Sequence, residues 1–145
     1  MPILRLVIFV AILLATLGGT MARAQQSGIV GAWVTQGMDP ATGTAIRVEY
    51  SFMPTGQFQK SFGMQVGASG GYDWIAGRWF TEGQWLRLEV QQHYSTSTGS
   101  NGPLPPGELW LYAMPNMNTL VLTHSACVQQ QLQRPDCVLQ LTRAQ

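Results

Sequence analysis

Residues 45–66 read AIRVEYSFMPTGQFQKSFGMQV. Apolar and polar residues alternate on both sides of the Pro-Thr-Gly segment at 54–56. Successive side chains of a β-strand point to opposite faces, so an alternation with a period of two indicates a strand with one buried face. Proline followed closely by glycine is typical of a tight turn. The stretch therefore predicts a β-hairpin with strands at 45–53 and 57–66.

The same alternation continues in both directions from this hairpin. It predicts six further strands, at 28–36, 72–80, 84–94, 108–114, 119–125 and 137–143. Gly77 indicates a bulge or bend within its strand, and helical spacing is confined to at most one turn between Cys127 and Cys137. Eight short strands predict an all-β fold, an antiparallel up-and-down barrel, because closing a sheet removes its free edges. A two-sheet β-sandwich is the alternative.

Residues 1–24 have the features of a cleaved signal peptide. Arg5 precedes an apolar run at 6–17, and the Ala-Arg-Ala segment at 22–24 offers small residues for cleavage. The apolar run is shorter than the ~20 residues that a membrane-spanning helix needs, although an uncleaved anchor is the alternative. We therefore expect one domain at 25–145, periplasmic or secreted, with no membrane span after cleavage.

The charge balance excludes some classes of partner. The chain carries eight Lys and Arg against seven Asp and Glu. Cleavage would remove two of the arginines and leave six positive against seven negative side chains. A nearly neutral surface does not attract polyanions over long distances. We therefore expect no nucleic-acid partner.

Cys127 and Cys137 are the two cysteines of the chain. An exported protein keeps disulfides oxidised, and the segment between the two cysteines is polar and contains a Pro-Asp turn signal. A bridge closing this loop would stabilise the fold by about 3 kcal/mol in the chain-entropy model. The alternative, a redox-active pair, requires close spacing and an activating environment. The sequence therefore predicts a structural disulfide.

Residues that could perform catalysis or bind metal do not form a recognisable pattern. The two histidines, His93 and His124, have no metal-ligand spacing, and the carboxylates are scattered along the chain. The sequence also lacks zinc, nucleotide and nucleophile motifs. We therefore expect no enzyme activity, no metal and no cofactor.

Two polar residues on the strands have an expected orientation. His93 shares its parity with Arg87, which predicts that it faces solvent. Asp73 lies between Tyr72 and Trp74, so it faces water if those two rings face inward.

Aromatic residues are concentrated in the strands at 45–80. The candidate ligand-binding residues are Tyr50, Phe52, Phe58, Lys60, Phe62, Tyr72, Trp74 and Trp79. Aromatic rings around a concavity suit an apolar or planar ligand, but a packed core would use the same residues. Lys60 lies between two phenylalanines of the same parity. It either faces inward, where its ammonium could meet an anionic head group, or snorkels outward.

These features favour an exported, non-enzymatic protein that binds a small apolar or amphipathic molecule inside a β-barrel. The alternative is an envelope protein-interaction module or inhibitor that uses the barrel surface and the loop at 95–107. That loop is rich in Ser, Gly and Pro. Loops of such length are usually either functional lids or surface excursions.

Short motifs along the chain resemble those of a known family. Gly31-Ala32-Trp33 is similar to the Gly-x-Trp that opens lipocalins and related calycin barrels, and residues 52–58 look like a strand-turn-strand unit of small bacterial lipocalin-like domains. Arg143 stands where a lipocalin arginine packs over that tryptophan. The resemblance implies an eight-stranded barrel in which Gly31, Trp33 and Arg143 have structural roles, with Trp33 plugging the closed end.

Overall fold

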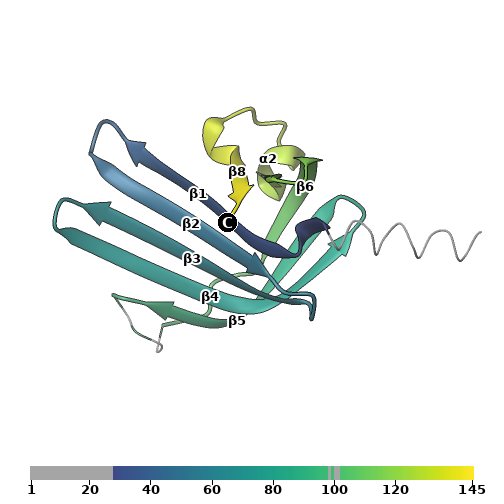
Figure 1. Ribbon diagram of the computed structural model, residues 1–145, viewed down its shortest axis with the longest axis horizontal. Coiled ribbons are helices and arrows are strands. Elements are labelled where there is room, and N and C mark those ends of the chain that lie inside the picture. The colour runs from purple at the N-terminus through teal and green to yellow at the C-terminus, as the bar shows by residue number, and fades with distance from the viewer. Residues whose placement is uncertain (1–27, 98, 100–101) are drawn as a thin grey trace, which may run out of the picture.

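The computed structural model describes residues 28–97, 99 and 102–145. Within these residues, eight antiparallel strands follow one another in chain order around a closed barrel (Figure 1). The strands are β1 (Gly31–Asp39), β2 (Thr44–Phe52), β3 (Gln57–Val66), β4 (Ser69–Glu82), β5 (Trp85–Ser95), β6 (Glu108–Asn116), β7 (Thr119–His124) and β8 (Val138–Arg143). This confirms the predicted up-and-down barrel. The sandwich alternative is wrong, because β1 pairs with β8 and closes the sheet. The predicted signal peptide at 1–24 lies outside the described residues.

Strand ends differ from the sequence prediction at several places. The first strand begins at Gly31 rather than Gly28, because Gly28 and Ile29 are helical. A short helix, α2 (Ser125–Gln129), follows β7, and a 3-10 turn, η1 (Pro135–Cys137), precedes β8. The disulfide between Cys127 and Cys137 joins these two segments, with a Cα–Cα distance of 5.9 Å. The described residues include no helix that is long and apolar enough to cross a membrane.

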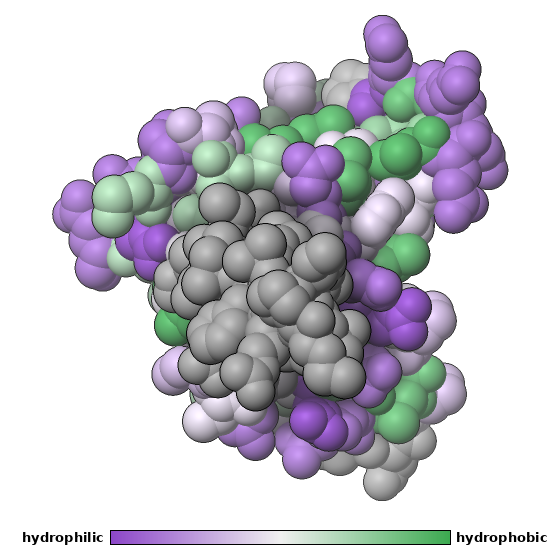
Figure 2. All heavy atoms as spheres, turned by 90° about the vertical axis from the view of Figure 1, so that its right-hand side faces the viewer, coloured by the Kyte–Doolittle hydropathy of each residue, from purple (hydrophilic) through white to green (hydrophobic). Residues whose placement is uncertain are grey.

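One end of the barrel is filled by a core of large side chains. The largest fully buried side chains are Ile29, Trp33, Tyr50, Phe52, Phe58, Trp79, Leu86, Leu88, Leu120, Leu122 and Leu141. They belong to one contiguous hydrophobic cluster. In Figure 2, which views the molecule from this side, the described residues expose both hydrophilic and hydrophobic side chains. The barrel is therefore solid here.

The other end is open because the strands differ in length. In Figure 1, β1 to β5 extend well beyond the short strands that complete the barrel; β4 has 14 residues and β8 has 6. The sheet closes between β1 and β8 through Trp33 and Val34, paired with Arg143 and Thr142. Beyond these pairs, no described strand lies beside the outer edge of β1.

A β-bulge changes the orientation of residues along β5. The register between β4 and β5 shifts at Ala76 and Gly77, so Gln91 is an extra residue without a partner in the ladder. A side chain at Gly77 would collide with the backbone carbonyl of Glu89, so the position requires glycine. The bulge reverses which face each later residue of β5 presents to the interior.

Candidate functional site

The interior of the barrel contains an ion pair between distant parts of the chain. Lys60 Nζ lies 2.5 Å from Glu108 Oε1, and each side chain is 20% exposed. Both residues face inward because their ladder partners are core residues: Lys60 pairs with Ile75, and Glu108 pairs with Leu88. The pair therefore lies on top of the filled half of the barrel.

Glu108 receives two further hydrogen bonds through its other carboxylate oxygen. Trp110 Nε1 donates to Oε2 at 2.9 Å, and the Tyr50 hydroxyl donates to the same atom at 3.3 Å. Burial, and secondarily the neighbouring Glu108 carboxylate, raise the pKa of Tyr50 well above its ordinary value. Tyr50 therefore remains a neutral donor, and the carboxylate has three donors in a site largely withdrawn from water.

A pocket of about 220 Å³ opens directly above this pair. Its lining consists of Lys60, Phe62, Asp73, Trp74, Ile75, His93, Pro105 and Glu108. Ligand pockets usually measure ~300–1,000 Å³, so this one suits a small molecule or the end of a larger one. Apolar walls around a few polar groups are the usual composition of a ligand site.

Asp73 and His93 both line this pocket. The solvent-facing orientation expected for His93 is wrong, whereas Asp73 is exposed to water at the open end although Tyr72 and Trp74 do not face inward. Ladder partners share a face of the sheet: Asp73 lies opposite Phe62, and His93 lies opposite the buried Ile75. His93 faces inward because the extra Gln91 reverses the alternation of β5. The buried Nδ1 of His93 has no hydrogen-bond partner among the described residues.

The predicted ligand-binding residues fall into three groups. Lys60 and Phe62 line the pocket. Tyr50, Phe52, Phe58 and Trp79 are core residues with 2% exposure or less. Tyr72 and Trp74 lie on the outward row of β4, because the neighbouring Ile75 faces the core. Trp74 still borders the pocket, whereas Tyr72 is 44% exposed.

At the opposite end of the barrel, Arg143 lies over Trp33. The guanidinium carbon is 4.3 Å from the centre of the indole ring, within the range of a cation–π contact. Arg143 also donates to the backbone carbonyls of Gly28, Val30 and Met117 at 2.9–3.0 Å. A side chain at Gly31 would collide with this guanidinium, and its φ of 136° also favours glycine. These contacts close the barrel end around Trp33.

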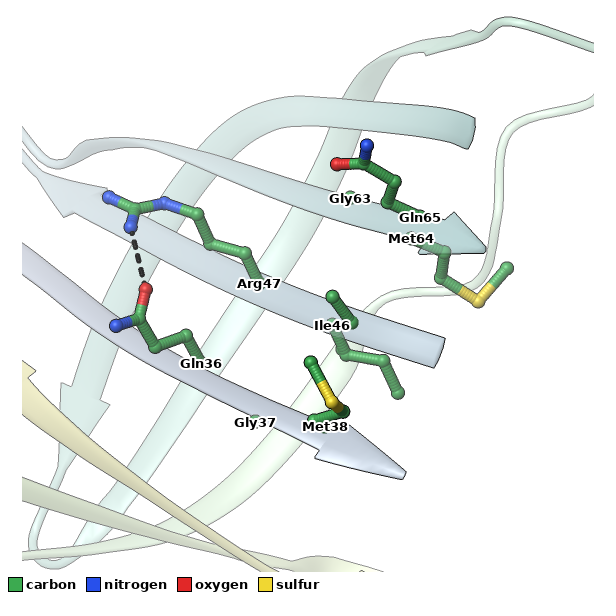
Figure 3. Close-up of a pocket in the computed structure, with 9 residues that line it drawn as sticks. Gln36, Gly37, Met38, Ile46, Arg47, Gly63, Met64 and Gln65 are labelled. Carbon is green, nitrogen blue, oxygen red and sulfur yellow. Dashed lines mark hydrogen bonds between the residues drawn. The ribbon is translucent and has the colours of Figure 1, made fainter. Parts of the chain in front are cut away.

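Further depressions lie elsewhere on the described surface, among them one of about 580 Å³ beside Gly28 and Met114 and one of about 470 Å³ beside Phe80 and Trp85. A depression of about 560 Å³ spans the open ends of β1, β2 and β3 (Figure 3), where Arg47 Nη1 donates to Gln36 Oε1 at 3.1 Å. Another, of about 230 Å³, includes Tyr72 and Trp74 on the outer wall. None of these depressions is lined by Lys60, Glu108 or Phe62, which line the pocket at the open end.

The loop at 95–107 contributes to the pocket. Ser95 pairs with Gly99, and the backbone N–H of Thr96 donates to the Tyr72 carbonyl at 2.9 Å. Pro105, near the end of the loop, is one of the lining residues. Residues 98, 100 and 101 lie outside the described part.

Sequence reasoning missed Glu108 as part of the site, although a signal was present. Glu108, Trp110 and Tyr112 share one parity, and two aromatic residues of that parity predict an inward face. His93 had no comparable signal, because the bulge appears only once β5 is paired with β4. Across the residues that the structure describes, His, Cys, Asp and Glu form no group of three that could hold a metal ion.

Comparison with protein families and with curated proteins finds no match to this chain.

Proposed function

We propose that this chain is an exported, non-enzymatic binding protein of the lipocalin-like type, which holds a small apolar or amphipathic molecule at the open end of its barrel. The observation that carries the proposal is the pocket floored by the Lys60–Glu108 pair and walled by Phe62, Ile75 and Pro105. An ion pair with 20% of each side chain exposed gives the pocket a polar floor beneath apolar walls.

Two other features support the export part of the proposal. The Cys127–Cys137 disulfide is of the kind that persists in the periplasm or outside the cell. The sequence features of residues 1–24 agree with passage across a membrane.

The lipocalin-like part of the proposal has its own support. The barrel closure at Trp33 and Arg143 is similar to that expected from the lipocalin resemblance.

The test is a calorimetric titration with benzyl alcohol, a neutral molecule with one apolar ring. We expect saturable binding of one molecule per chain, weakened about ten-fold in Phe62→Ala because a large apolar contact is lost. Phe80→Ala is the matched control, since Phe80 lies on the outer face of β4. A heat signal that does not saturate, or equal weakening by the two substitutions, contradicts the proposal.

A protein-interaction role is the second candidate, and the edge of β1 favours it. Residues 35–39 have no described strand on their outer side, and Met38, near the end of that edge, is 69% exposed. An extended segment of another envelope protein could add to such an edge through backbone hydrogen bonds. Cross-linking in an envelope extract should then capture a partner with the wild type and lose it with Met38→Lys. Equal capture by both proteins would remove this candidate.

A further inference from the structure

We propose that the pocket at the open end selects amphipathic cations, in which an ammonium group is attached to a short apolar body. This inference rests on the proposed binding function and specifies the class of ligand.

The first step concerns Lys60, whose ammonium is already neutralised. Its Nζ lies 2.5 Å from Glu108 and 5.2 Å from the centre of the Tyr50 ring. An anionic head group that bound Lys60 would have to displace the Glu108 carboxylate. That carboxylate would then lie beside the incoming anion in a site with little water, which is costly for both negative charges. Lys60 therefore does not provide a binding site for anions.

The second step concerns Asp73, an exposed residue that lines the pocket at the open end and carries a negative charge. Among the described residues, Asp73 makes no ion pair and no side-chain hydrogen bond. It lies directly opposite Phe62 on the inner face, where paired residues have Cβ atoms about 5 Å apart. A carboxylate and an aromatic ring on the same wall of a pocket can both attract an ammonium group, the first through its charge and the second through its ring quadrupole.

The third step is the charge balance of the pocket lining. The charges of Lys60 and Glu108 cancel each other, and Asp73 is the remaining charged carboxylate of the lining. The arginines of these strands do not compensate it: Arg78 and Arg87 are exposed on the outer face, and Arg47 binds Glu49 and Gln36. The field inside the pocket therefore favours cations over anions.

The fourth step is the shape of the lining. The polar groups lie on the floor and on the β4–β5 side, while Phe62, Ile75 and Pro105 provide apolar contact. A volume of about 220 Å³ has room for a short chain or one ring, and not for a long lipid.

The experiment is calorimetric titration of the disulfide-intact chain with three probes of equal length: hexyltrimethylammonium, hexanol and hexyl sulfate. We expect the ammonium compound to bind at least ten-fold more tightly than the sulfate, with hexanol between them. Asp73→Asn should bring the ammonium compound to the affinity of hexanol. Glu89→Gln is the matched control, because it removes one negative charge from the outer face of β5 and should leave the order unchanged.

The outcomes separate this inference from the proposed function. Binding of hexyl sulfate as tight as that of the ammonium compound, or an ammonium preference that survives Asp73→Asn, overturns the cation selectivity while the pocket remains a binding site. Loss of the preference in Glu89→Gln also overturns it, because the effect would then come from net charge alone. Failure of all three probes to bind overturns the proposed function together with the inference.

Discussion

At the closed end of the barrel, Trp33 is fully buried beneath the guanidinium of Arg143, whereas at the open end Lys60 and Glu108 each keep a fifth of their side-chain surface exposed. The same strands build both ends, because β1 to β5 run from one to the other. The inner face changes from a continuous aromatic and leucine core to a polar floor under apolar walls. The different lengths of the strands therefore determine which part of the interior is filled. Side chains fill the interior where all eight strands are present, and a pocket forms beyond the ends of β6 to β8.

The largest expected difference between the two ends is in stability. We expect Trp33→Ala to lower the free energy of unfolding by about 3–5 kcal/mol, because it leaves a cavity at the centre of the closed end. Trp74→Ala removes the same atoms from the outward row of β4 and should cost less than about 2 kcal/mol. Urea unfolding measures both values. Equal losses would show that the closed end does not hold the barrel together.

The disulfide should have the next largest effect. We expect the double variant Cys127→Ser, Cys137→Ser to lose about 3 kcal/mol of unfolding free energy, because the unfolded chain is no longer restrained. The bridge anchors the segment before β8, which joins β1 at few ladder positions. Urea unfolding of the oxidised wild type and the double variant provides the measurement. A difference below about 1 kcal/mol would contradict a structural role.

The Lys60–Glu108 pair should give a smaller effect with a distinctive pattern. Lys60→Met leaves Glu108 without its charge partner, and we expect a loss of about 1–3 kcal/mol. Adding Glu108→Leu to this variant should recover most of the loss, since an apolar pair no longer needs a partner. A double-mutant cycle of unfolding free energies measures the coupling. Additive losses would mean that the two groups do not depend on each other.

The smallest expected effect concerns Tyr50 and its dependence on pH. At neutral pH, Tyr50→Phe removes the hydrogen bond to Glu108 and should cost about 1 kcal/mol. Burial raises the pKa of Tyr50 in the folded chain. Below pH ~10 the phenol is protonated in both the folded and the unfolded chain, so the stability that Tyr50 contributes is fully retained. Above that pH the unfolded phenol ionises and the wild type loses stability, a loss that the variant does not share.

The stability difference between wild type and Tyr50→Phe should therefore shrink as the pH rises above ~10. Burial also raises the pKa of Tyr112, but that residue is present in both proteins and cancels in the difference. A Tyr50→Phe difference that stays constant through the alkaline range would mean that Tyr50 ionises equally easily in the folded chain.

Alternation along the sequence was sufficient to predict the barrel and much of its interior. Phe52 and Phe58 share a parity with the other apolar residues of their strands, and both are buried. The strand at 72–80 was ambiguous, because Trp74 and Trp79 have opposite parities and cannot both face inward without a bulge. Packing decides between them: Trp79 fits the core, where its indole N–H donates to the Met53 carbonyl at 3.1 Å.

The candidate site was harder to predict because it depends on pairing between strands. Lys60 and Glu108 are 48 positions apart, and their contact follows from closure of the barrel. His93 faces inward because of the unpaired Gln91 in β5. The open end itself results from the short β6 to β8, and neither strand length nor a bulge can be read from the alternation of one strand.

An amide chemical-shift titration with hexanol, followed by NMR, shows directly which end of the barrel receives a ligand. We predict saturable shifts at Phe62, Ile75 and His93, with the amides of Leu120 and Leu141 unchanged in the filled end. Shifts confined to Leu120 and Leu141, or to the outer-wall residue Tyr72, would contradict a binding pocket at the open end.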